Sequence, residues 1–125
     1  MVTRTVHEWT YDYASVSESG DYYQVLFEKS DDNDDCYVLI QSQFEFPQDC
    51  DVIVETDAGD WFAELVVERA TLDQQRLLID GSDKEKAVRI IVFYSADAGT
   101  YAELIRVFKI MLPDIDVHPR SSKLE

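Results

Sequence analysis

The chain has 125 residues and a mass of 14.4 kDa, and its 26 acidic and 11 basic residues give a formal net charge of −15. The length predicts a single domain, and an apolar fraction of 46% with 12% aromatic residues is typical of a globular protein. So negative a charge disfavours direct binding to nucleic acid or to an anionic membrane surface, because like charges repel. The negative charge is compatible with a basic protein partner. It is also compatible with a role of this chain as a mimic of nucleic acid.

The negative charge is concentrated in one segment. Between Ser30 and Glu68 there are 12 acidic residues and no Lys, Arg or His, whereas the rest of the chain holds 14 acidic and 11 basic residues. One interpretation of such a run is a solvated surface without a partner. The other is a surface that attracts a cationic partner and speeds its association by about 10- to 1,000-fold.

Alternation of polar and apolar residues, broken by turn signals, predicts seven strands before the last quarter of the chain. They are Thr5–Ser15, Tyr22–Lys29, Cys36–Gln43, Val52–Thr56, Trp61–Arg69, Gln74–Asp80 and Val88–Tyr94. The last of these is apolar on both faces, which indicates a central place in the sheet. The connections predict an acidic loop at 30–35, a hairpin turn at 57–60, turns at 70–73 and 80–81, and one helical turn at 83–86.

One helix is predicted near the end of the chain. Thr100 and Glu103 form a capping box, and the apolar residues around them recur at helical spacing: Tyr101, Leu104, Ile105, Phe108 and Met111. Pro113 ends this pattern. We therefore expect an α+β domain over residues 1–113, with a mostly antiparallel, meandering sheet of six to seven strands and one C-terminal helix packed on it. Residues 114–125 are expected to form a flexible tail that ends in vector residues.

One acidic stretch resembles a calcium loop only in part. Asp31, Asn33 and Asp35 match positions 1, 3 and 5 of an EF-hand. Cys36 stands where that loop needs glycine, and Ser42 stands where it needs a bidentate glutamate. A solvated loop is therefore the better interpretation.

No other residues are spaced for metal binding or catalysis. His7 and His118 lie at opposite ends of the chain, and neither is close in sequence to Cys36 or Cys50, which we interpret as reduced thiols. The four glycines sit singly in predicted turns, so no phosphate-binding loop is indicated. We expect no cofactor, no metal and no catalytic residue, and hence no enzyme.

The surface of two central strands is the best candidate for function. The strands Val52–Thr56 and Trp61–Arg69 interleave carboxylates with apolar side chains, which is what an interface with a basic protein needs. The candidate partner-binding residues are Asp51, Glu55, Asp57, Asp60, Trp61, Phe62, Glu64 and Glu68. The alternative is that Ile53, Phe62 and Val66 pack under the helix or another layer. The periodicity leaves both open.

Four stretches resemble a family of bacterial immunity proteins, the tenth such family of polymorphic toxin systems. The stretches are Tyr23–Phe27, Tyr37–Gln41, Asp51–Asp57, and Arg89–Phe93 followed by Tyr101–Phe108. The resemblance implies a small, acidic, cytoplasmic protein that binds and neutralises a toxin domain and has no catalytic residues. This chain departs from the family at Ser42, where an arginine is common, and at Trp61–Ala63, where a glycine pair is common.

The sequence therefore favours an immunity-type protein that blocks a cationic toxin domain. If the toxin is a nuclease, the carboxylates would mimic the phosphates of its substrate. A nucleic-acid mimic that inhibits a DNA-binding protein is an alternative, and it requires carboxylates spaced like phosphates along a ridge. A small ligand-binding domain is another, and it requires a deep pocket with convergent polar groups.

Overall fold

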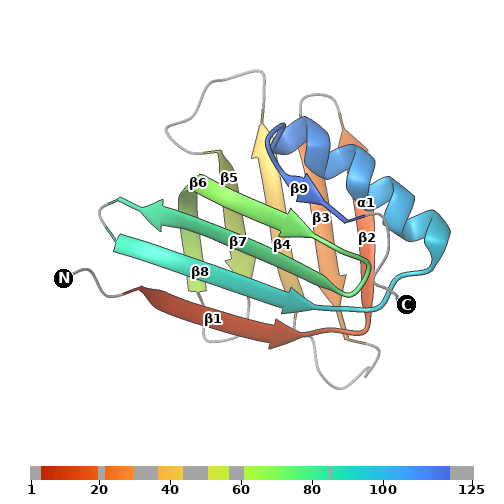
Figure 1. The fold of residues 1–125 in the computed structure, drawn as a ribbon, viewed down its shortest axis with the longest axis horizontal. Helices are drawn as coiled ribbons and strands as arrows, with labels where there is room; N and C mark the ends of the chain where they lie inside the picture. The colour runs from red at the N-terminus through yellow and green to blue at the C-terminus, as the bar shows by residue number, and fades with distance from the viewer. Residues whose placement is uncertain are drawn as a thin grey trace.

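The computed structural model describes residues 4–19, 22–29, 37–43, 51–56, 61–84 and 86–118. In these ranges there are nine strands and one helix (Figure 1): β1 (Thr5–Thr10), β2 (Tyr13–Ser19), β3 (Tyr22–Glu28), β4 (Tyr37–Gln43), β5 (Val52–Thr56), β6 (Trp61–Leu72), β7 (Arg76–Asp83), β8 (Lys86–Phe93), α1 (Ala98–Met111) and β9 (Asp116–Val117). The expected α+β class and meandering sheet are confirmed. The expected number of six to seven strands is too low.

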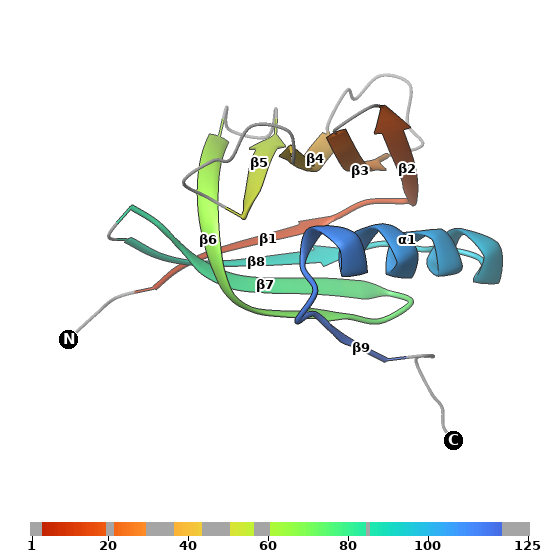
Figure 2. The same cartoon turned by 90° about the horizontal axis from the view of Figure 1, so that it is seen from above.

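The strands form one sheet in the order β1-β8-β7-β6-β5-β4-β3-β2, and the short β9 pairs with β6. Neighbours along this order are antiparallel, except that β1 runs parallel to β8. Figures 1 and 2 show that β2–β5 run across the direction of β1, β7 and β8, so the sheet has two halves that face each other. No helix among the described residues has the length and apolar character needed to cross a bilayer.

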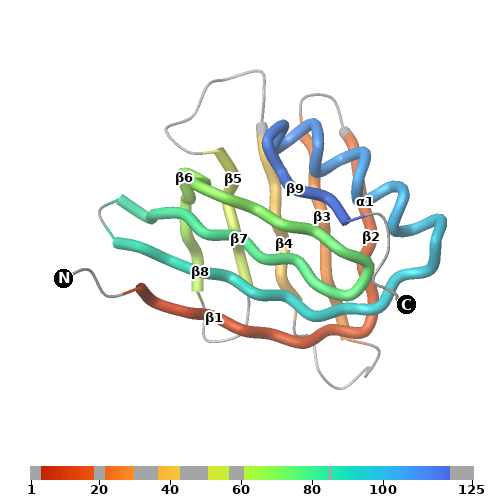
Figure 3. Tube along the Cα trace, viewed as in Figure 1, coloured from red at the N-terminus to blue at the C-terminus, as the bar shows by residue number. Residues whose placement is uncertain are grey.

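The long strand β6 joins the two halves. Its first residues, Trp61–Leu65, pair with β5, and the following ones pair with β7. The register shifts between Val67 and Arg69, which leaves Glu68 as the extra residue of a β-bulge. Figure 3 shows that β6 bends where it passes from one half of the sheet to the other. Bulges bend and twist a strand, so this one helps to turn the sheet back on itself.

Gly81 lets β7 approach β6 closely at that bend. A Cβ atom on Gly81 would lie 2.4 Å from the carbonyl oxygen of Val66, so no larger residue fits without movement of the backbone. The turn predicted at 70–73 lies between Leu72 and Arg76 instead, because β6 continues to Leu72. The turn predicted at 80–81 is wrong, because Gly81 lies inside β7. The predicted helical turn at 83–86 is also wrong. Asp83 pairs with Lys86 at the end of a hairpin, and Lys84 has a φ of 60°.

The first predicted strand, Thr5–Ser15, is in fact two strands, one in each half of the sheet. The chain turns at Tyr11, whose backbone N–H donates to the carbonyl of Phe93 at 2.8 Å. The N–H of the next residue, Asp12, donates to the carbonyl of Glu28 at 2.9 Å. This corner therefore ties β8 in one half to β3 in the other.

The helix α1 packs against β2 and β3 and lies between the two halves of the sheet in Figure 2. Its residues Leu104, Val107 and Phe108 are completely buried, as are Val25 and Phe27 of β3. The side that the sequence predicted to be apolar is thus the buried side.

The helix α1 ends at Met111, before Pro113, as predicted, but its start and the segment that follows it differ from the prediction. The helix begins one turn earlier than the capping box indicates, because the carboxylate of Asp97 accepts from the N–H of Thr100 at 2.7 Å. Beyond the helix, a loose tail was expected from Asp114. Residues 114–118 instead lie against the sheet, where Ile115 is buried and β9 pairs with β6.

Candidate partner-binding surface

The face of β3–β6 that is turned away from α1 carries the candidate site, and we call it the outer face. Along each strand, the residues between those of the outer face point to the inner side. Among them, Val25, Val38, Val54 and Leu65 are completely buried. The outer face consists of Gln24, Leu26, Glu28, Tyr37, Leu39, Gln41, Ile53, Glu55, Phe62, Glu64 and Val66.

Strand register places these side chains in rows across the strands. One row runs from Leu26 through Leu39 and Glu55 to Phe62. Apolar side chains therefore meet a carboxylate within one row. Residues directly opposite on one face of an antiparallel pair lie close enough to contact each other, so the row is a continuous surface.

The adjacent row is more polar. It runs from Gln24 through Gln41 and Ile53 to Glu64. Gln24 donates through Nε2 to Oε1 of Gln41 at 2.9 Å. At the β6 end of this row, Ile53 lies beside Glu64, just as Phe62 lies beside Glu55 in the first row.

Two apolar side chains of β6 are open to solvent. Phe62 is 55% exposed and Val66 is 47% exposed. They do not pack under the helix, which lies on the other side of the sheet. This resolves the alternative that the periodicity left open, and it leaves an aromatic group available on the outer face.

Glu55 is held in place by a neighbouring strand. The hydroxyl of Tyr37 donates to Oε2 of Glu55 at 2.8 Å. A carboxylate that is already oriented loses less conformational freedom when it accepts a bond from a partner. Glu64 lies opposite Ile53 and is exposed.

No family model, no curated protein and no solved structure matches the chain. Its function must therefore be inferred from the geometry of this surface and from the sequence. In the described parts of the chain, no three His, Cys, Asp or Glu side chains come together in a way that could hold a metal ion.

The structure separates Trp61 from the outer face. Its ring points inward and lies 4.2 Å from the ring of His7 and 5.8 Å from that of Trp9, measured between centroids. Burial in this cluster lowers the pKa of His7 below its ordinary value. Trp61 thus fills the space between the two halves of the sheet, and only its neighbour Phe62 is placed to contact a partner.

The remaining predicted residues lie at the margin or outside the described ranges. Asp51 accepts through Oδ2 from the N–H of Val67 at 3.0 Å, at the edge of the face. Glu68 is exposed in the bulge, beyond the rows. Asp57 and Asp60 lie outside the described residues, as do the acidic loop at 30–35 and both cysteines.

Sequence reasoning missed the part of the outer face that β3 and β4 provide. Leu26, Glu28, Tyr37 and Leu39 belong to it because β4 pairs with both β3 and β5. The alternation of β3 and β4 was visible in the sequence. Placing their outer residues beside Phe62 also required the order of the strands.

Proposed function

We propose that this protein is an immunity-type protein that binds a basic toxin domain through the outer face and so blocks it. The observation that carries the proposal is the row from Leu26 to Phe62, in which the exposed Phe62 lies beside the carboxylate of Glu55 and in line with the half-buried Leu39 and Leu26. Buried aromatic and aliphatic side chains supply most of the affinity of an interface. Carboxylates accept bonds from arginine and raise the rate of encounter with a basic partner.

The arrangement of charges favours a protein partner over mimicry of nucleic acid. Glu55 has Leu39 and Phe62 on either side in its row, and Glu64 has Ile53 beside it. A mimic of the phosphate backbone needs a ridge of closely spaced charges without apolar groups between them. Charge and shape indicate only that the partner is a basic protein. The proposal that this partner is a toxin domain rests on the resemblance to immunity proteins.

The test is binding to the toxin domain encoded by the neighbouring gene, measured by calorimetry at low salt. Phe62→Ala is expected to weaken binding roughly 30-fold, the loss typical of an interface hot spot. The matched control is Val6→Ala, which truncates a residue 53% exposed on β1, in the other half of the sheet.

Charge reversal gives a second, independent comparison. Glu64→Lys on the outer face is expected to weaken binding at least tenfold, whereas Glu8→Lys on β1 changes the net charge equally and is expected to have little effect. Absence of binding by the wild-type protein would overturn the proposal. Equal weakening by both reversals would show that only net charge matters and that the outer face is not the site.

A further inference from the structure

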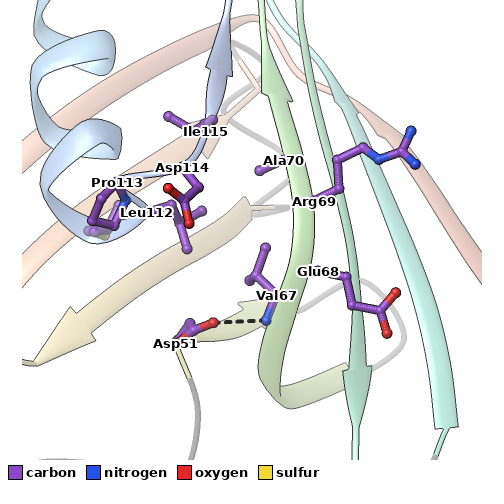
Figure 4. A pocket seen from close by; sticks show the side chains of 10 residues that line it. Asp51, Val67, Glu68, Arg69, Ala70, Leu112, Pro113, Asp114 and Ile115 are labelled. Carbon is purple, nitrogen blue, oxygen red and sulfur yellow. Dashed lines mark hydrogen bonds between the residues drawn. The ribbon is translucent and has the colours of Figure 1, made fainter.

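A pocket of about 200 Å³ lies beside β6, at the end of α1 and outside the rows of the outer face (Figure 4). Val67 and Ala70 of β6 form one wall, and Leu112 and Ile115 form the other. Three of these four side chains are largely buried, so packing already holds them in place.

The pocket exists because one edge of β6 is covered in two separate places. β5 pairs with this edge as far as Leu65, and β9 pairs with it at Thr71 and Leu72. Among the described residues, no strand pairs with this edge between those places. The bulge at Glu68 lies in the ladder with β7, on the opposite edge, and it bends β6 beside the opening. A bent strand is a poor template for an added strand, so the opening suits an inserted side chain better.

Three acidic residues line the pocket, and two of them, Asp51 and Asp114, border it on different sides, whereas the side chain of Glu68 projects away from α1 (Figure 4). Asp51 stands at the β5 end, where its bond from the Val67 N–H fixes its position. Asp114 projects from the segment that follows α1 (Figure 4). A carboxylate has about four acceptor positions, so the bond from Val67 leaves Asp51 able to accept others.

The end of α1 adds to the negative potential. The helix ends at Met111, and Leu112 is its C-cap, so the negative end of the helix dipole lies at the pocket. The nearest basic residue of β6, Arg69, lines the pocket but directs its guanidinium away from it, on the far side of the strand (Figure 4). The pocket thus has apolar side chains between β6 and the end of α1 and a negative rim.

We propose that this pocket receives an arginine side chain of the basic protein partner. The aliphatic stem of arginine would lie between Val67 and Leu112, and its guanidinium would bond to Asp51 and Asp114. Arginine fits better than lysine, because its planar guanidinium offers five donors that can serve two carboxylates and is more weakly hydrated. The choice of a protein as the source of the arginine rests on the proposed function.

The pocket is tested without the toxin, by amide NMR of the ¹⁵N-labelled full chain. The probe is N-acetyl-arginine-methylamide, and the control is the citrulline analogue, which has the same shape but no charge. Arginine is expected to produce saturable shifts at the amides of Val67, Ala70 and Ile115, and citrulline none. Equal shifts from both probes, or arginine shifts centred on Glu55 and Glu64, would overturn the proposal.

A pair of variants locates the effect. Asp114→Asn is expected to weaken arginine binding at least threefold, while Asp116→Asn, an equal change of charge on β9, leaves it unchanged. An unchanged affinity in Asp114→Asn would overturn the site. The same pair is then measured against the toxin domain, where Asp114→Asn is expected to weaken binding at least fivefold and Asp116→Asn is not.

The two proposals fail in different ways. If the wild-type protein does not bind the toxin domain, the proposed function and the protein source of the arginine are overturned, whatever the NMR shows. If toxin binding is normal but the arginine probe gives no saturable shifts, the pocket alone is overturned.

Discussion

Replacing Gly81 by alanine tests the close approach of β7 to β6, on which the bend of the sheet depends. The added Cβ would lie 2.4 Å from the carbonyl oxygen of Val66 and 3.2 Å from the Cα of Val67. Both neighbours are backbone atoms of a paired strand, so neither can rotate away. The two strands must separate by roughly 1 Å to restore ordinary contact distances.

We expect Gly81→Ala to lower the free energy of unfolding by about 3 kcal/mol, the upper part of the range for overpacking a well-packed site. The assay is urea denaturation followed by tryptophan fluorescence, which reports on Trp9 and Trp61 inside the fold. With a urea m-value of about 1.5 kcal/mol/M, the midpoint is expected to fall by about 2 M.

Gly99→Ala is the matched control. Gly99 lies in the first turn of α1, and the nearest atom to an added Cβ is Oδ1 of Asp97 at 3.6 Å, which is an ordinary contact. Alanine is favoured over glycine in a helix by up to about 1 kcal/mol, so this variant is expected to be as stable as the wild type or more so. If Gly81→Ala proves equally stable, the strands do not approach each other as described and the reasoning is refuted.

Three further predictions concern single polar groups. Asp97→Ala removes the N-cap of α1 and is expected to cost about 1 kcal/mol in urea denaturation; no loss would show that the cap contributes nothing. Arg89 bonds to the carboxylate of Asp80 at 2.7 and 2.9 Å and holds the pKa of Asp80 below its ordinary value of 3.8. This stabilisation is present above about pH 4 and is lost as the pH falls further, so Asp80→Asn is expected to show a shallower loss of stability than the wild type between pH 4 and 2.5. Burial raises the pKa of Tyr101 from 10 to about 12, so the folded protein retains a proton that the unfolded chain releases, and stability is expected to fall between pH 10 and 12. Tyr101→Phe is expected to show a smaller fall in stability over that range. At pH 7 the same variant is expected to be about 1 kcal/mol less stable than the wild type, because it lacks the hydrogen bond to the carbonyl of Leu72. Urea denaturation at pH 7 and between pH 10 and 12 checks both expectations.

Local sequence patterns predicted where strands occur better than they predicted where strands end and which strands pair with each other. Val52–Thr56 forms a strand over the predicted residues, because its alternation and the turn residue after it act within a few positions. Gly81 was assigned to a turn for the same local reason. Its place inside β7 depends on β6, which no short window contains.

The corner at Tyr11 shows a second limit. The alternation of His7, Trp9, Tyr11 and Tyr13 runs unbroken through it, so the sequence contains no signal for a change of direction. The backbone bonds of Tyr11 and Asp12 tie this corner to β8 and β3, which lie outside any short stretch of sequence around it.

The candidate site was predictable in composition but not in orientation. The sequence showed that Phe62 and Glu64 share one face of a strand, which the structure confirms. It did not show which face the helix covers, because that depends on the path of the chain from β8 to α1. Trp61 was a reasonable anchor by residue type, and the packing of β1 against β6 assigns it to the interior instead.

The parallel pairing of β1 with β8 has a consequence for how the protein is assembled during synthesis. The strands β3–β8 can each pair with the strand made just before, whereas Thr5 must wait for Val88 to leave the ribosome. Contacts between such distant residues slow folding, and a waiting strand with unpaired backbone groups invites pairing with other chains. Shortening Thr5–Thr10 is therefore expected to leave β8, otherwise an interior strand, at an open edge of the sheet.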